Sequence, residues 1–210
     1  ISVIPLAQSH DILKATHLKH HAHTNDPDSD PDFFHGNAKN WWDAAINVNV
    51  SFNDDGPALK AIEKHMEEDP KFKEAFGKGS AWSFLFYFAQ IILAVLYPLE
   101  TLLLWWIPKR VATSYLGIVF SYFPHSGLGQ GRYTDTRFWT NKMPRFLNHS
   151  MQIHSMHHMY PRICHYDEAK AIEALKPFMI ERGMPGAEYI PEKLRWNPVT
   201  FIKEVYFGGR

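Results

Sequence analysis

The fold is decided by the stretch AWSFLFYFAQIILAVLYPLETLLLWWI, residues 81–107. Its only charged residue is Glu100, and a helical run of this length and apolarity is long enough to cross a bilayer. The sequence Pro-Lys-Arg at 108–110 interrupts it, and residues 111–123 are apolar again. The sequence therefore predicts a mainly α-helical integral membrane protein with a membrane hairpin over about residues 81–123.

Two divisions of this hairpin fit the sequence. In the first, one span covers 81–107 and a short one begins at 111. In the second, the first span ends near Tyr97 and the next runs from about 101 to 123, which places Lys109 and Arg110 near mid-membrane, where charges are costly unless they snorkel or face protein. Both divisions give two crossings. The alternative is a buried helical hairpin of a soluble protein.

The amino-acid composition limits the kinds of binding site that the chain can form. A chain of 210 residues suits a single domain over 1–210, and 22 basic residues balance 22 acidic ones, so nucleic-acid binding is not expected. The single cysteine, Cys164, excludes an internal disulfide and any cysteine-rich zinc or iron–sulfur site. With 13 histidines beside it, the sequence favours a metal held by nitrogen ligands.

The pattern His-x-x-His-His occurs twice, once on each side of the hairpin. On a helix, positions i, i+3 and i+4 share a face, so each copy directs three imidazoles to one point. Paired structural histidines or a surface metal patch are the alternatives. We interpret the pattern as a site for more than one metal, and its residues are His17, His20, His21, His154, His157 and His158.

The hairpin also constrains the arrangement of these copies. If both serve one metal centre, they lie on the same side of the membrane, which requires an even number of crossings between them, and two crossings meet this condition. His125 follows the second apolar run directly and is therefore a candidate additional ligand.

The segments around the first copy leave alternatives open. Residues 24–32, TNDPDSDPD, form either a solvated acidic loop or a loop from which Asn25 or Asp26 hydrogen-bonds the histidines, as metal-bound imidazoles usually require. The aromatic residues Phe33, Phe34, Trp41 and Trp42 suit either a membrane interface or, equally well, the core of the domain.

Helical spacing is visible in three further segments. A helix is expected over 12–23, which contains no Pro or Gly. Residues 57–79 alternate charges with apolar residues and predict a solvent-facing amphipathic helix, broken or kinked at Pro70. A third amphipathic helix is expected over 167–182, whereas 183–210 are uninformative.

Together these features resemble the membrane-bound fatty acid desaturase and hydroxylase superfamily, and most closely its carotenoid (beta-carotene) hydroxylase branch. The likeness covers most of residues 10–182. It is carried by HLKHHAHTNDP at 17–27, by FPH at 123–125 with QGRYTDTR at 130–137, and by HSMHHMYP at 154–161.

The resemblance implies a single desaturase-like domain in which a cytosolic helical cap carries a histidine-rich di-metal site. It implies two iron ions, O₂ as co-substrate, a ferredoxin- or cytochrome b5-type electron donor, and a long lipid whose unactivated C–H bond is attacked. Asn148 and His149 are candidates for groups beside the ligands or on bound water. The implied iron ligands are His17, His20, His21, His154, His157 and His158, with His125 added.

The sequence departs from the family pattern at its beginning. Relatives have a first box, His-x(3–4)-His, upstream of the second, but no second histidine follows His10 at that spacing. We expect that box, with two further spans, in an N-terminal part missing from this sequence; without it the iron site is short of ligands. Ile163-Cys164-His165 stands where relatives have Pro and aromatic residues, so His165 is left unassigned.

The ligands alone do not decide the reaction or the substrate. The same iron site supports hydroxylation or desaturation, and the substrate is a carotenoid or a fatty acyl chain, with residues 25–27 and 131–133 favouring the carotenoid. The alternative from a different class is a non-catalytic membrane metal-binding protein, or an inactive fragment, that binds zinc.

Overall fold

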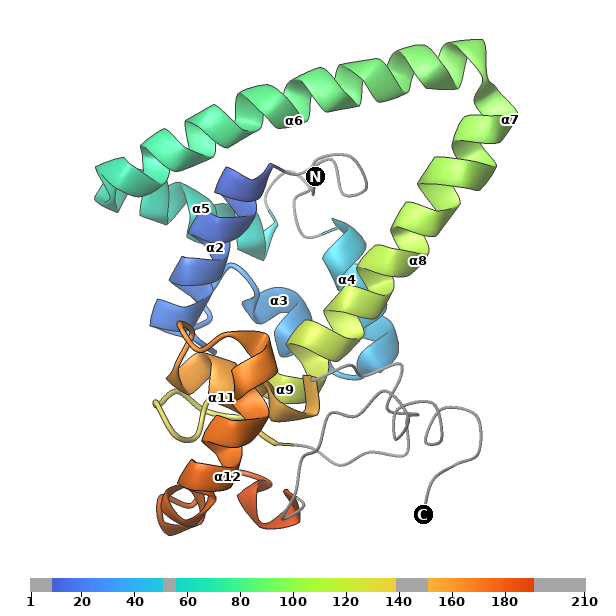
Figure 1. Cartoon of the computed structure of the whole chain (residues 1–210). Helices are drawn as coiled ribbons and strands as arrows, with labels where there is room; N and C mark the ends of the chain where they lie inside the picture. Colours follow the sequence, from blue (N-terminus) through green and yellow to red (C-terminus); the bar gives the residue numbers. More distant parts are fainter. Residues whose placement is uncertain (1–8, 51–55, 139–150, 191–210) are drawn as a thin grey trace, which may run out of the picture. The chain divides into compact units, whose positions relative to one another are not determined.

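The computed structural model describes residues 9–50, 56–138 and 151–190 (Figure 1). These residues form helices joined by turns, and none of them belongs to a strand, which confirms the mainly helical class. The chain divides into two compact units, Ile1–Ile118 and Val119–Arg210. A single desaturase-like domain over 1–210 stays a prediction.

The first histidine copy lies on α2 (His10–His23) in the first unit. Ser9 caps this helix because its side chain accepts a hydrogen bond from the Ile12 amide at 3.3 Å. The predicted helix over 12–23 is thus confirmed, and it begins two residues earlier. It ends at His23 with Thr24 as its C-cap, and Asn25 then adopts a φ of 63°, a left-handed conformation that asparagine tolerates better than most residues.

The charged segment 57–79 is divided between two helices. α5 (Pro57–Glu68) ends before Asp69, whose side chain accepts hydrogen bonds from the amides of Lys71 and Phe72 and so caps α6 (Pro70–Leu96). The predicted break at Pro70 is confirmed, because proline suits the first turn of a helix. The expected end at residue 79 is wrong: the same helix continues through the apolar stretch.

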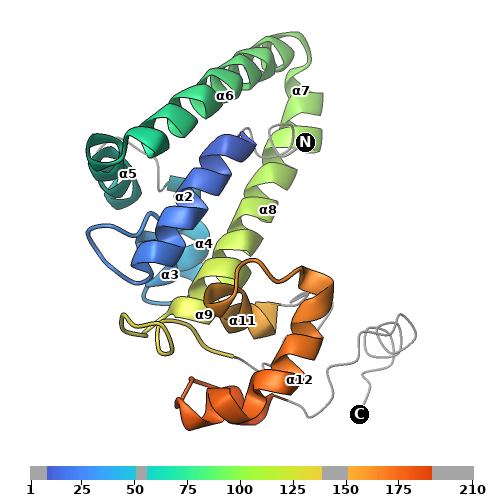
Figure 2. The same cartoon turned by 60° about the vertical axis from the view of Figure 1, so that its left-hand side comes forward.

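The hairpin bends at Tyr97-Pro98 (Figures 1 and 2). The return arm consists of α7 (Pro98–Thr101), the π-helical η1 (Leu102–Trp106) and α8 (Ile107–Leu116), and the π-helical η2 (Gly117–Tyr122) follows. A single span over 81–107 is therefore wrong. The second division, with a first arm ending near Tyr97, is the one that the structure adopts.

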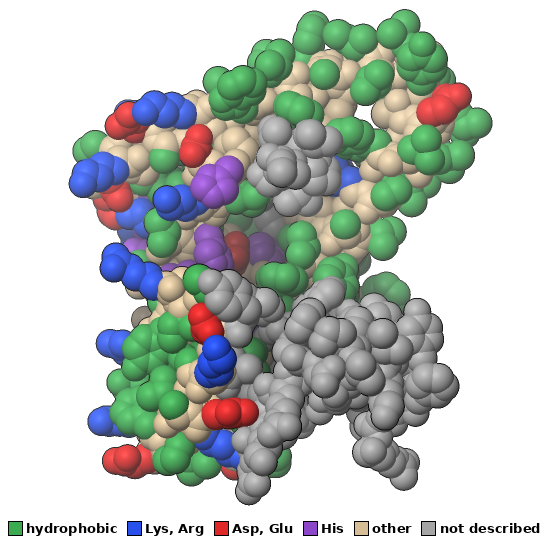
Figure 3. Space-filling view, in the orientation of Figure 1, with side chains coloured by type: hydrophobic (Ala, Val, Ile, Leu, Met, Phe, Trp, Pro, Cys, Tyr) green, Lys and Arg blue, Asp and Glu red, His purple; other side chains and the backbone are tan. Residues whose placement is uncertain are grey.

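Apolar side chains on both arms of the hairpin are exposed. Phe84, Val95 and Leu104 are 75%, 76% and 78% exposed, and hydrophobic side chains cover the arms in the space-filling view (Figure 3). The alternative of a hairpin buried within a soluble protein is therefore not supported. Within the described ranges, α6 alone is long and apolar enough to cross a membrane, by length and composition only. The second crossing stays a prediction.

The two cations of the return arm contact protein groups. The Arg110 guanidinium donates to the Asn49 carbonyl oxygen at 3.0 Å, and the Lys109 ammonium lies 5.0 Å from the centre of the Tyr87 ring. Asn49 belongs to α4 (Trp41–Val50), which packs against α8. These contacts are the kind of partner that charges near a bilayer require.

The tryptophans at the start of α4 do not belong to a core. Trp41 and Trp42 stack with ring centroids 4.0 Å apart and are 43% and 63% exposed. For these two tryptophans core packing is therefore wrong, and a membrane-interface position stays a prediction; Phe33 and Phe34 are half-buried.

Helix α2 packs against the hairpin at the start of the first arm, α6. A Cβ added at Gly79 would lie 2.2 Å from the Ser9 Oγ and 2.6 Å from an Ile12 side-chain carbon, so only glycine allows this approach. The Ser9 amide donates to the Ser83 hydroxyl at 3.2 Å, and Lys19 pairs with Asp69 at 2.9 Å. The first histidine cluster therefore has a fixed position relative to the hairpin.

The second unit is organised around an apolar core rich in methionine. The helices that the structure describes wholly within it are α9 (Phe123–His125), η3 (Met151–Ile153), α11 (His154–Met159), α12 (His165–Glu181) and η4 (Ala187–Tyr189). α12 confirms the helix predicted over 167–182 to within two residues at its start. The buried core residues are Phe138, Ile153, Met156, Met159, Ile172, Met179, Met184, Ala187 and Ile190.

Candidate metal centre

The first cluster, His17, His20 and His21, lies on the last two turns of α2. The Nε2 atoms of His17 and His21 are 3.1 Å apart, as expected for residues one helical turn apart whose rings turn toward each other. The ring of His20 stacks 5.9 Å from that of His17. The predicted convergence is present for His17 and His21, whereas binding of one metal by all three imidazoles stays a prediction.

His20 is held from outside the helix by Asp30. The Nδ1 atom of His20 lies 2.8 Å from the Asp30 Oδ1, and both side chains are buried. Asp30 belongs to the loop of residues 24–32 that follows α2. Its burial at 3% exposure shows that this loop is not simply a solvated acidic segment.

The second cluster, His154, His157 and His158, lies on α11 in the second unit. The Nε2 atoms of His154 and His158 are also 3.1 Å apart, and the ring of His157 lies 5.5 Å from that of His154. Met156 and Met159 on the same short helix are buried in the methionine-rich core. The core thus fixes the helix, and the helix fixes the histidines.

The structure places His125 against this second cluster, as the sequence predicted. Its ring lies 4.8 Å from that of His158 and 5.7 Å from that of His154. The residue is buried, and its Nδ1 lies 3.3 Å from the backbone oxygen of Asp135. A proton on Nδ1 in this hydrogen bond puts the ring lone pair on Nε2.

These donor sets suit a transition metal. Two nitrogen ligands of one metal, each bonded at about 2.1 Å, stand roughly 3 Å apart. The two Nε2 pairs at 3.1 Å have this separation within their own helices. Imidazole nitrogens suit iron and zinc alike, so the geometry fits a metal site without selecting the ion.

A comparison with known families decides the class. The family model described as fatty acid desaturase matches residues 1–189. The chain belongs to the fatty acid desaturase family. No curated protein and no solved structure matches it. Family membership indicates a lipid oxygenase-type enzyme, an oxidoreductase, and a membrane protein, and it confirms the superfamily predicted from the histidine motifs.

Two further histidines of this desaturase-family chain support the structure around the first cluster. The ring of His65 on α5 bonds the Ser29 carbonyl oxygen at 2.7 Å from its Nε2 and so ties the 24–32 loop to α5. His35 on α3 (Phe33–Gly36) is buried 3.6 Å from an Asp32 carboxylate oxygen. Burial lowers the pKa of His35 despite this carboxylate, and burial likewise lowers the pKa of His65.

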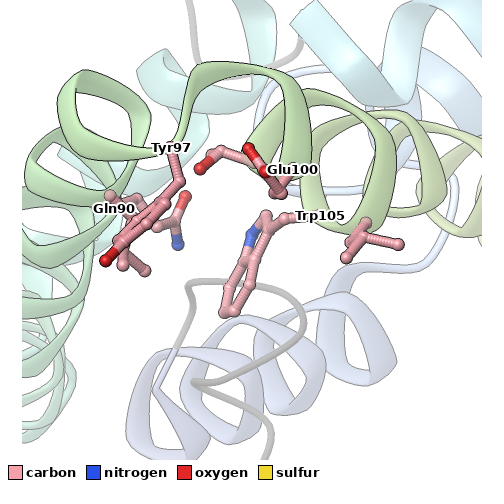
Figure 4. A pocket seen from close by; sticks show the side chains of 7 residues that line it. Gln90, Tyr97, Glu100 and Trp105 are labelled. Carbon is pink, nitrogen blue, oxygen red and sulfur yellow. The ribbon is translucent and has the colours of Figure 1, made fainter.

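A cavity of about 220 Å³ lies at the bend of the hairpin and contains no histidine (Figure 4). Gln90, Tyr97, Glu100 and Trp105 surround it, with Leu93, Thr101 and Leu104. The cavity is too small for a long lipid chain, which needs upwards of roughly 300 Å³. The exposed apolar side chains of the hairpin, rather than this cavity, form the surface that suits a lipid.

Four residues were predicted to lie beside the histidines of the clusters, and the structure describes two of them, Asn25 and Asp26. Asp26 accepts a hydrogen bond from the Asp28 amide at 3.0 Å, and the carboxylate on His20 is that of Asp30 instead. Asn25 is buried and donates its amide to the Asp30 Oδ2 at 2.9 Å, so it lies one contact further from the histidine. The predicted Asn148 and His149 lie outside the described residues.

Sequence reasoning missed Asp30 and the backbone oxygen of Asp135. A signal for Asp30 was present, since a turn-rich loop that contains four aspartates directly after a histidine helix can return to it. Which of those aspartates reaches His20 depends on the left-handed turn at Asn25, and the sequence pattern does not predict that turn. For a backbone oxygen no sequence signal exists.

Proposed function

We propose that this chain is a membrane-bound non-haem di-iron oxygenase that hydroxylates or desaturates a long lipid with O₂. The observation that supports this best is the pair of imidazole nitrogens 3.1 Å apart in each of two helices, in a chain of the fatty acid desaturase family. Nitrogen-only ligation leaves coordination positions for O₂, as non-haem oxygenases require.

We propose as iron ligands the seven histidines of the two clusters and α9, namely His17, His20, His21, His125, His154, His157 and His158. When bound, two iron ions supply O₂ activation with electrons from a ferredoxin- or cytochrome b5-type donor. The chain's own contribution is orientation: His20 and His125 each have Nδ1 against an oxygen, which directs Nε2 toward a metal.

The proposed substrate reaches the site from the bilayer. The exposed apolar arms of the hairpin support this, because an insoluble chain diffuses along such a surface without entering water. We favour a carotenoid over a fatty acyl chain, on residues 25–27 and 131–133 that resemble the carotenoid hydroxylase branch. The metal site lies at the cytosolic face in this proposal, where soluble electron donors reach it.

The test is metal content together with product formation. The protein is expressed from its native reading frame, purified in mild detergent and analysed for iron and zinc. It is then supplied with O₂, a reduced electron donor and either a carotenoid or a fatty acyl lipid. About two irons per chain and an O₂-dependent product support the proposal, and the mass of the product separates hydroxylation (gain of one oxygen) from desaturation (loss of two hydrogens). Tightly bound zinc without O₂ consumption would instead support a non-catalytic metal-binding protein.

A further inference from the structure

We infer that Asp30 is a positioning residue that fixes the tautomer and the ring orientation of His20, so that Nε2 is the nitrogen offered to the metal. The inference rests on the proposed function only in taking His20 as a ligand. The hydrogen bond itself does not depend on the proposed function. It joins His20 Nδ1 to Asp30 Oδ1 at 2.8 Å, between two buried side chains of this chain.

The direction of this hydrogen bond follows from what else Asp30 accepts. Its Oδ1 also accepts from the Asp32 amide at 2.8 Å, and its Oδ2 accepts from the Asn25 amide at 2.9 Å. Both of these amides are donors, so we take the carboxylate as the acceptor toward His20 as well. The proton of a neutral His20 therefore sits on Nδ1 and the lone pair on Nε2.

The loop holds this carboxylate in place. The left-handed turn at Asn25 reverses the chain after α2, and the Asn25 side-chain oxygen accepts from the Asn37 amide group at 3.1 Å. Directly before Asp30 in the chain, Ser29 is tied to α5 through His65 and through Lys64, whose ammonium donates to the Ser29 hydroxyl at 2.8 Å. Asp30 is thus supported by the chain before it and, through the Asp32 amide, by the chain after it, as a positioning group must be.

Asp30→Asn tests the inference with little change in volume. If the amide oxygen keeps facing His20, the amide nitrogen faces the Asn25 amide, and two donors oppose each other. If the amide turns over, its N–H₂ faces His20 Nδ1 and favours the proton on Nε2, the nitrogen needed for the metal. Loss of such a group beside a metal-bound histidine typically weakens metal binding by about 10- to 100-fold.

The matched control is Asp28→Asn. Asp28 lies on the same loop and loses the same charge, but its side chain is exposed, and its backbone amide rather than its carboxylate makes the contact with Asp26. Any effect of net charge on the loop appears in both variants. An effect through His20 appears in Asp30→Asn only.

The first measurement is made on metal-free protein labelled with ¹⁵N-histidine in detergent. Long-range ¹H–¹⁵N correlation spectra report which ring nitrogen carries the proton, and the His20 signals are identified by their loss in His20→Ala. We expect the Nδ1–H form in the parent and in Asp28→Asn, and a gain of the Nε2–H form in Asp30→Asn. An Nε2–H form of His20 in the parent overturns the inference, even if Asp30→Asn does not fold.

The second measurement is the affinity for Fe²⁺ under anaerobic conditions, by competition with a chelator. We expect affinity about 10- to 100-fold lower in Asp30→Asn and unchanged in Asp28→Asn. Parent-like affinity in a folded Asp30→Asn overturns the inference. If the parent has the Nδ1–H form and the expected affinities but yields no O₂-dependent product, the proposed function fails while the role of Asp30 stands.

Discussion

The two His-x-x-His-His copies have the same local geometry but different supports. Each places two Nε2 atoms 3.1 Å apart across one helical turn. The first copy lies on a 14-residue helix that packs against the hairpin and bonds a carboxylate, whereas the second lies on a 6-residue helix set in an apolar core. The spacing of a motif therefore fixes the convergence of its rings, and the surroundings determine how the rings are held.

Removal of one ligand from each copy has the largest expected effect. His20→Ala and His157→Ala should each abolish O₂-dependent turnover while the protein stays membrane-inserted, since a metal site that loses a ligand loses both affinity and geometry. Product assay and membrane fractionation measure this. Full activity in either variant contradicts the ligand assignment, and Lys14→Ala, an exposed position on α2, is a matched control for a change on the first helix.

The support of the second copy is broken by Met156→Ala. Met156 lies between His154 and His157 in the sequence and is fully buried in the apolar core, and truncation of a buried methionine typically costs about 2–5 kcal/mol. We expect a lower thermal unfolding temperature and lower iron occupancy through the second cluster. Met151→Ala, at a partly buried residue outside α11, should cost clearly less. Equal losses from both would show that the core does not hold this helix.

The support of the first copy is broken by Gly79→Ala. The added methyl group meets Ser9 and Ile12, and overpacking of this kind typically costs about 1–3 kcal/mol. We expect α2 to shift from α6 and iron affinity to fall. The control is Gly77→Ala on the same helix, because a Cβ there meets nothing within 4 Å and alanine favours helix. Destabilisation by the control alone would contradict the contact.

Acid should weaken the first unit through its buried histidines. The pKa of His35 is lowered by burial, so the unfolded chain binds the proton more readily than the folded one, and this contribution is present above the unfolded pKa of about 6.5 and lost as the pH falls below it. Stability in detergent, measured from pH 8 to pH 5, should therefore fall. His35→Gln should reduce that dependence, and an unchanged pH profile would contradict the assignment.

Asp69 should give the smallest effect, because its carboxylate is partly exposed to solvent that screens its charge. The pKa of this carboxyl is lowered by the hydrogen bond from Lys19 and by the amides of Phe72 and Lys71. Its contribution is present above the unfolded pKa and is lost as the pH falls through the lower folded one. Asp69→Asn should lower the unfolding temperature only slightly, and high salt should reduce the part due to Lys19. A loss as large as that of Gly79→Ala would contradict this ranking.

The sequence by itself determined the helical class, the hairpin, and the convergence of His17 with His21 and of His154 with His158. These features depend on local rules, namely the length of an apolar run and the 3.6-residue period of a helix. The same rules placed the break at Pro70, because proline lacks an amide hydrogen and suits the start of a helix.

Only the tertiary structure decided which oxygens hold the histidines and where the hairpin bends. Asp30 reaches His20 because the chain reverses at Asn25, and the fold of the second unit brings the His125 ring to that of His158. Such contacts join residues distant along the chain, and no periodicity encodes them. The close approach at Gly79 is likewise a property of two helices together, and neither helix alone reveals it.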